Sequence, residues 1–137
     1  MVELAPRAAS EKTEKISVNL GLVDLGEIDL LVHEGFYANR TDFIRTAIRA
    51  QLATRAQAVH NTVARRTLEL GAHLVTRAEL EALRRAGRTR DVRVLGLATI
   101  ADDVPAELAA ATISHVEVLG AFKATPAVRA ALKDRTV

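Results

Sequence analysis

The sequence has no cysteine and no tryptophan, and aromatic residues make up only 3% of its 137 positions. Without cysteine it can form neither a disulfide framework nor a thiolate metal site, and this composition fits the reducing cytoplasm. No apolar run approaches the roughly 18 residues that a membrane helix needs. The first dozen residues lack the apolar middle of a signal peptide, so we expect residues 1–12 to form a flexible arm.

Residue patterns typical of enzymes and metal sites are also missing. The four histidines show no repeated chelate spacing; they are His33, His60, His73 and His115. The adjacent acids Asp102 and Asp103 precede Pro105, and we interpret them as the end of a turn whose charge favours the start of the next helix. The sequence contains no glycine-rich phosphate loop, nucleophile elbow or Ser/His/Asp pattern. We therefore expect no enzyme activity, no metal and no cofactor.

Residues 14–20 show a strict alternation of polar and apolar side chains. The apolar positions are Ile16, Val18 and Leu20, and the polar positions between them are Lys15, Ser17 and Asn19. This period of two predicts a half-buried β-strand. Because helical patterns follow at once, the strand has no partner nearby in its own chain. The simplest partner is the same strand of a second chain, and a two-stranded ribbon fits the major groove of DNA.

Two helical patterns follow this predicted strand. In the first, apolar residues recur at intervals of three or four, and the pattern ends at Gly35, where a left-handed C-terminal cap is expected. In the second, Asn39 is the expected N-cap, with Thr41 and Asp42 in the first turn. Neither glycine nor proline interrupts the residues that follow, so we predict a helical connector over residues 56–66.

Residues 14–55 resemble the ribbon-helix-helix superfamily of DNA-binding proteins, the group of the Met and Arc repressors and the CopG-type regulators. The resemblance rests on three stretches, Lys15–Leu20, Ile28–Gly35 and Tyr37–Ile48, and covers about a third of the chain. It implies a β-α-α unit over residues 13–55 that intertwines with a second copy. The paired strands of such a dimer enter the major groove.

The resemblance also implies which residues contact DNA. Lys15, Ser17 and Asn19 would face the bases, where an asparagine can form paired hydrogen bonds with adenine and a lysine can donate to guanine. Arg40 and Thr41 would contact a phosphate through the backbone N–H groups at the start of the second helix.

The remaining implied roles are structural. Asn39 would cap the helix at the phosphate site rather than contact DNA. The core between the two chains would consist of the apolar residues of the strand and of both helices, namely Ile16, Val18, Leu20, Leu25, Ile28, Val32, Ile44 and Ile48.

Residues 67–137 alternate between strand-like and helical patterns. Strand-like runs are predicted at Thr67–Leu70, Asp91–Leu97 and His115–Phe122. Helices are expected after Thr76 and Thr125, which have the positions of N-caps, and after Pro105. The segment therefore reads as a small C-terminal domain.

Part of this C-terminal domain repeats. The tripeptide Val94–Gly96 recurs 24 residues later as Val118–Gly120, and Leu70–Gly71 is a weaker earlier copy. This period suggests a short solenoid of strand–helix units. A compact α+β domain that dimerises is the alternative.

Arginines are concentrated between residues 65 and 93, at positions 65, 66, 77, 84, 85, 88, 90 and 93. Such a basic belt could contact phosphates. It is equally consistent with arginines that only solvate helix faces.

Together these patterns predict an α+β protein that binds double-stranded DNA sequence-specifically and represses transcription. We expect a homodimer that the C-terminal domain, residues 67–137, joins into tetramers or larger assemblies. One alternative is an antitoxin that represses its own operon and binds a toxin through its C-terminal part. Another is a structural protein that organises DNA or forms filaments. We expect the protein to be cytoplasmic and associated with the nucleoid.

Overall fold

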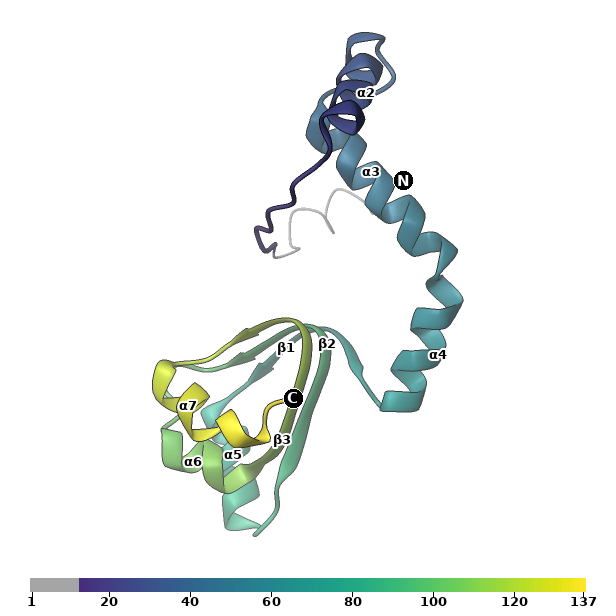
Figure 1. The fold of residues 1–137 in the computed structure, drawn as a ribbon. Helices are drawn as coiled ribbons and strands as arrows, with labels where there is room; N and C mark the ends of the chain where they lie inside the picture. The colour runs from purple at the N-terminus through teal and green to yellow at the C-terminus, as the bar shows by residue number, and fades with distance from the viewer. Residues whose placement is uncertain (1–12) are drawn as a thin grey trace. The chain divides into compact units, whose positions relative to one another are not determined.

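The computed structural model describes residues 13–137, which fall into two compact units divided between residues 56 and 57 (Figure 1). The flexible arm expected at residues 1–12 lies outside the described residues. The N-terminal unit contains two helices, and the C-terminal unit contains a parallel sheet with helices. Each unit is described in turn.

The N-terminal unit begins with an extended segment, residues 13–21, that belongs to no helix or strand. Helix α2 then spans Leu22–His33 and helix α3 spans Arg40–Thr54. The chain reverses between them because Gly35 has a φ of 86°, in the left-handed region. The N–H of Gly35 donates to the carbonyl of Val32, and that of Phe36 to the carbonyl of Leu31, at 3.1 and 3.0 Å. These two bonds form a Schellman motif, so α2 ends where the sequence predicted.

A further helix, α4, spans Ala56–Arg66, the range expected for the connector. It is followed by Thr67, the only non-glycine described residue with a positive φ, at 56°. That left-handed residue separates α4 from the first strand, which begins only at Glu69. The predicted strand Thr67–Leu70 was therefore placed too early, because the backbone at Thr67 is not extended.

The C-terminal unit repeats a strand followed by a helix three times. The strands are β1 (Glu69–Val75), β2 (Arg90–Ile100) and β3 (Ile113–Lys123), and the helices are α5 (Arg77–Arg85), α6 (Ala106–Thr112) and α7 (Pro126–Ala131). All three strands run parallel in the order β1-β2-β3. A short 3-10 helix at Lys133–Arg135 follows. This arrangement matches the strand–helix repeat suggested by the 24-residue period.

Helices α5, α6 and α7 cover one face of the sheet (Figure 1). Alternate strand residues point toward them and are buried, as Val92 and Val94 are in β2. The core is aliphatic, as the scarcity of aromatic residues predicted. It comprises Val75, Leu80, Val92, Val94, Ala98, Ile100, Val104, Leu108, Ala109, Ile113, Val116, Val128 and Leu132.

A row of three glycines crosses the sheet. Gly71, Gly96 and Gly120 are direct neighbours in the strand register, and their φ angles are 115°, 137° and 121°. A Cβ on Gly96 would overlap the carbonyl oxygen of Gly71, and one on Gly120 would overlap that of Gly96. Only glycine fits the last two positions, so the repeated glycine in the sequence corresponds to a close approach of adjacent strands.

Candidate nucleic-acid interface

The extended segment before α2 carries the three predicted base-contacting residues. Lys15, Ser17 and Asn19 are all exposed. The apolar residues that alternate with them are exposed too, with Ile16 at 75% and Val18 at 70%. No strand pairs with this segment within the described chain. The paired ribbon therefore stays a prediction that requires a second chain.

The two helices that follow bury very little. Among residues 13–56, Ile28 is the one buried hydrophobic residue. Leu25 and Val32, also expected in the dimer core, are half-buried. The large apolar side chains left exposed are Leu20, Leu22, Val23, Leu30, Phe36, Ile44, Ile48 and Leu52. One copy of this unit thus lacks a core of its own.

The first turn of α3 is closely organised. The Asn39 side chain accepts a hydrogen bond from the N–H of Asp42 at 2.8 Å, and the Asp42 carboxylate accepts one from the N–H of Ala38 at 2.9 Å. Asn39 is therefore the N-cap of the helix. Within the described chain, the N–H groups of Arg40 and Thr41 have no acceptor. Two backbone donors at the positive end of a helix suit an anion.

The Arg40 side chain does not point to an open phosphate site; it forms an ion pair with Asp29 of α2. Nε donates to Oδ1 and Nη2 donates to Oδ2, both at 2.8 Å. This hydrogen bond from Arg40 lowers the pKa of Asp29, and the same contact raises the pKa of Arg40. The sequence did not reveal this pair, because its members lie eleven positions apart on different helices. Only the backbone of Arg40 therefore remains available for the predicted phosphate contact.

An aromatic pair holds the turn against α3. Tyr37 and Phe43 pack edge to face, with ring centroids 5.0 Å apart and an interplanar angle of 83°. Phe36, next to Tyr37, stays 71% exposed. The pair fixes where α3 starts relative to the turn.

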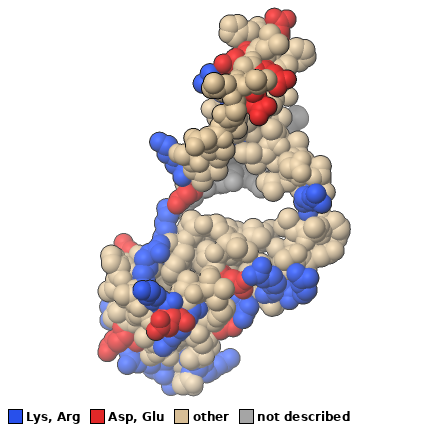
Figure 2. Space-filling view, viewed as in Figure 1, with Lys and Arg blue, Asp and Glu red and all other residues tan. Residues whose placement is uncertain are grey.

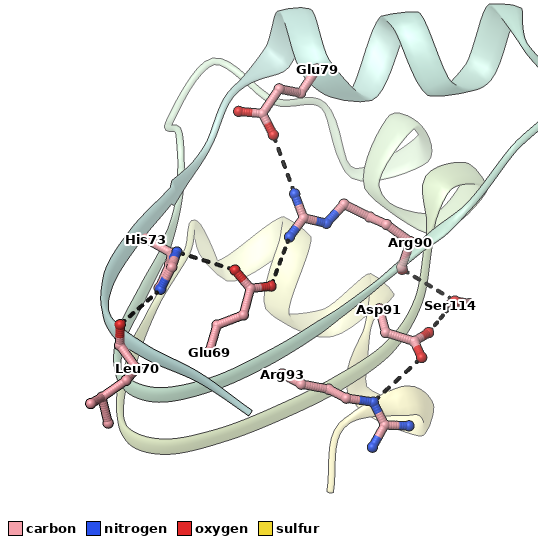
Figure 3. Close-up of polar contacts among 8 residues, drawn as sticks. All are labelled: Glu69, Leu70, His73, Glu79, Arg90, Asp91, Arg93 and Ser114. Atoms are coloured by element: carbon pink, nitrogen blue, oxygen red, sulfur yellow. Dashed lines mark hydrogen bonds and ion pairs between the residues drawn. The ribbon is translucent and has the colours of Figure 1, made fainter. Parts of the chain in front are cut away.

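Most arginines between residues 65 and 93 form ion pairs within the C-terminal unit. Five of the eight do so: Arg66, Arg77, Arg84, Arg90 and Arg93. Figure 3 shows Arg90 between Glu69 and Glu79. These contacts favour the structural interpretation of the basic belt over a phosphate-binding one.

Two acidic residues of the sheet organise their surroundings. Glu117 is only 6% exposed, and it forms ion pairs with Arg66 at the end of α4 and with Arg93 of β2. Asp91 accepts a 2.6 Å hydrogen bond from the Ser114 hydroxyl, which lowers the pKa of Asp91, with Arg93 contributing less (Figure 3). Asp91 lies at the start of β2, whereas Glu117 lies in the middle of β3.

Residues 13–137 contain neither a cluster of metal ligands nor a membrane-spanning helix. In that range, no three histidine, aspartate or glutamate side chains are grouped so that they could hold a metal ion. Within the same range, every helix is too short or too polar to cross a membrane.

A known protein family resembles most of this chain. The model of the Ribbon-Helix-Helix transcriptional regulator family matches residues 11–129. The match includes all three strands of the C-terminal unit. It therefore extends well beyond residues 14–55, on which the sequence resemblance rested. Neither the curated proteins nor the solved structures gave a match to the chain.

Proposed function

Because this chain belongs to the Ribbon-Helix-Helix transcriptional regulator family, we propose that it is a repressor that reads the major groove with a dimeric β-ribbon. Regulators of this family bind DNA and usually dimerise. The proposal adds the mode of reading, the direction of regulation and the residues involved.

The observation that carries the proposal is the missing core of the N-terminal unit. Ile44 and Ile48 of α3 are 39% and 48% exposed, and Ile16 and Val18 are more exposed still. Burying one such side chain contributes roughly 1.5–3 kcal/mol. Pairing two copies would bury the strand residues and the α3 stripe together. The apolar side of the ribbon would then face the helices, and its polar side would face outward.

That outward side carries the chemistry for reading bases. Asn19 can donate to and accept from one adenine, Lys15 can donate to guanine acceptors, and Ser17 can do either. The N–H groups of Arg40 and Thr41 would hold a phosphate beside the ribbon and so fix its register on the duplex. Asn39 supports that contact by capping the helix.

For the C-terminal unit we propose assembly of dimers. Its aliphatic core and capped helices form a folded module. Such a module differs from the flexible tail expected of an antitoxin, which disfavours that alternative. Joining two DNA-binding dimers raises the overall affinity for paired operator sites by about 10²–10⁴ through effective concentration.

The decisive experiment is selection of duplex DNA from a random library with the full-length protein, together with its mass by light scattering. We expect an enriched sequence with two related half-sites, and binding that weakens steeply with salt. A full-length protein that stays monomeric, or that enriches no sequence and ignores DNA at low salt, would overturn the proposal.

A further inference from the structure

The sheet of the C-terminal unit has a second face, opposite the one that α5, α6 and α7 cover (Figure 1). In β2, Val92 and Val94 point into the core, so Leu95 and Leu97 between and beyond them point to the opposite side. The strand register aligns Leu95 with Leu70 on one side and Leu119 on the other. We call this surface the outer face, and its apolar members are Leu70, Ala72, Leu74, Leu95, Leu97, Leu119 and Ala121.

The outer face is unusually apolar for a surface. Leu70, Leu74 and Leu119 are 67%, 57% and 44% exposed, and they lie on the same face of one sheet. Parallel sheets are normally covered on both faces, and a contiguous apolar patch usually marks an interaction site. In Figure 2 the charged side chains of this unit lie mainly along its margins, and a broad uncharged area lies between them.

We propose that the outer face is covered by the outer face of a second copy of this chain, packed about a two-fold axis. The two central rows, Leu70–Leu95–Leu119 and Ala72–Leu97–Ala121, contain no charge. They therefore offer nothing to DNA phosphates or to a charged partner. A copy of the same surface matches them in hydrophobic character without any repulsion.

The charges of the outer face lie toward its two ends and leave the apolar rows between them uncharged. Because all strands run parallel, Lys123 lies at one end, and Asp91, Arg93 and Glu117 lie at the other, where the two carboxylates already pair with arginines. A two-fold axis that reverses the strand direction of one copy would place each Lys123 beside the partner's acid-containing end and keep the two Lys123 side chains apart. Isologous contacts of this kind close on themselves and give a defined assembly. Two such sheets would pack at about 10 Å, as in a β-sandwich.

This inference rests on the proposed function in one respect. The ribbon-helix-helix dimer would hold two copies of the C-terminal unit on one assembly, which raises their effective concentration for pairing. The outer face then joins either the two chains of one dimer or the chains of two dimers in a closed tetramer. The contact itself is the same in both cases.

The chain has no native cysteine, so the contact can be tested by cross-linking single-cysteine variants of the full-length protein. Leu97→Cys places a thiol at the centre of the outer face. Ala82→Cys, on the exposed surface of α5, is the matched control. With a short bis-maleimide, we expect Leu97→Cys to give covalent dimers in at least several-fold higher yield than Ala82→Cys. Circular dichroism checks that both variants are folded.

A second variant separates a specific contact from random collision. Adding Leu70→Glu and Leu119→Glu to Leu97→Cys should lower the yield to that of the control, and these exposed positions tolerate charge in a single chain. Equal yields for Leu97→Cys and Ala82→Cys would overturn the proposal, as would an unchanged yield after the two glutamates. Mass that grows continuously with concentration would also overturn it, because it indicates edge-to-edge stacking of β3 on β1. DNA binding is measured separately, so loss of that function leaves the cross-linking result interpretable.

Discussion

Arg40 and Asp29 join the two helices of the N-terminal unit through two parallel hydrogen bonds of 2.8 Å. The planar guanidinium matches the carboxylate fork, a geometry that lysine cannot reproduce. The pair fixes the start of α3 against the middle of α2. The backbone donors of the proposed phosphate site are therefore held in place by a side chain that makes no DNA contact itself.

This pair should make stability depend on acid. The hydrogen bond from Arg40 lowers the pKa of Asp29, so Asp29 stabilises the fold above its unfolded pKa, and this contribution disappears as pH falls through the lowered folded value. We expect Asp29→Asn to melt below the wild type at pH 7 and the difference to vanish in strong acid. Thermal melts from pH 7 to pH 2 at one protein concentration check this. Arg40→Lys keeps the charge without the fork and should fall between the two; a pH-independent difference would contradict the expectation.

Ile48 gives a direct test of the missing core. The residue is 48% exposed in one chain, where truncation should change stability by no more than about 0.5 kcal/mol. In the proposed dimer it is buried, so Ile48→Ala should cost about 2–5 kcal/mol of dimer stability. Urea unfolding at several protein concentrations measures the difference. Arg49→Ala, one position along the same helix, is the control and should be nearly neutral.

The polar side of the ribbon should carry sequence specificity. Replacing Lys15 and Asn19 by alanine removes base contacts worth about 1–3 kcal/mol each, and a dimer loses them twice. We expect specific binding to vanish while the dimer stays folded, because both side chains point away from the proposed core. Fluorescence anisotropy and light scattering measure the two properties. Unfolding of the double variant would mean that the strand faces are inverted.

Glu14 provides the matched control for that experiment. Its carboxylate lies next to the proposed ribbon and should repel phosphates. Glu14→Gln should therefore tighten binding to all sequences by a similar factor and leave the sequence preference unchanged. A changed preference would indicate that residue 14 itself contacts bases.

The glycine row predicts a graded series of alanine substitutions. Gly71→Ala meets no neighbour and should cost only the strain of a positive φ, about 1–3 kcal/mol. Gly96→Ala adds an overlap with the Gly71 carbonyl and should cost clearly more. Gly26→Ala has open space within α2 and should gain about 0.5–1 kcal/mol, unless the partner helix packs there. Chemical denaturation measures the free energy of unfolding of the three variants. Equal losses of stability for Gly71→Ala and Gly96→Ala would contradict the strand register.

Local signals in the sequence predicted local structure well. Asn39, Thr76 and Thr125 each accept a hydrogen bond from the N–H three residues later, as N-caps do. These signals depend on neighbours only, so one sequence is enough to read them. The start of β1 was predicted too early because nothing in the sequence shows that the backbone of Thr67 is left-handed.

Features that depend on distant residues could not be predicted in the same way. The Asp29–Arg40 pair requires knowing how α2 and α3 cross, and the burial of Glu117 requires knowing that Arg66 and Arg93 meet above it. The near-continuous apolar run around Leu95 did indicate a strand. It gave no sign of which face the helices would leave bare. The proposed ribbon requires a second chain, so it cannot be seen in a single one.

The sparse interior around Ile28 also has a kinetic consequence. The strand–helix repeats make contacts between residues about 24 positions apart, so the C-terminal unit is expected to fold as a first-order process at any dilution. In the proposed dimer, the N-terminal unit completes its core only when two chains meet, which would make its formation second order in protein. Newly made chains would then pass through a period in which one half is native and the reading half is still incomplete. Under the proposed function, repression would begin only above a threshold concentration of the protein in the cell. The onset of repression would therefore depend on how much of the protein has been synthesised.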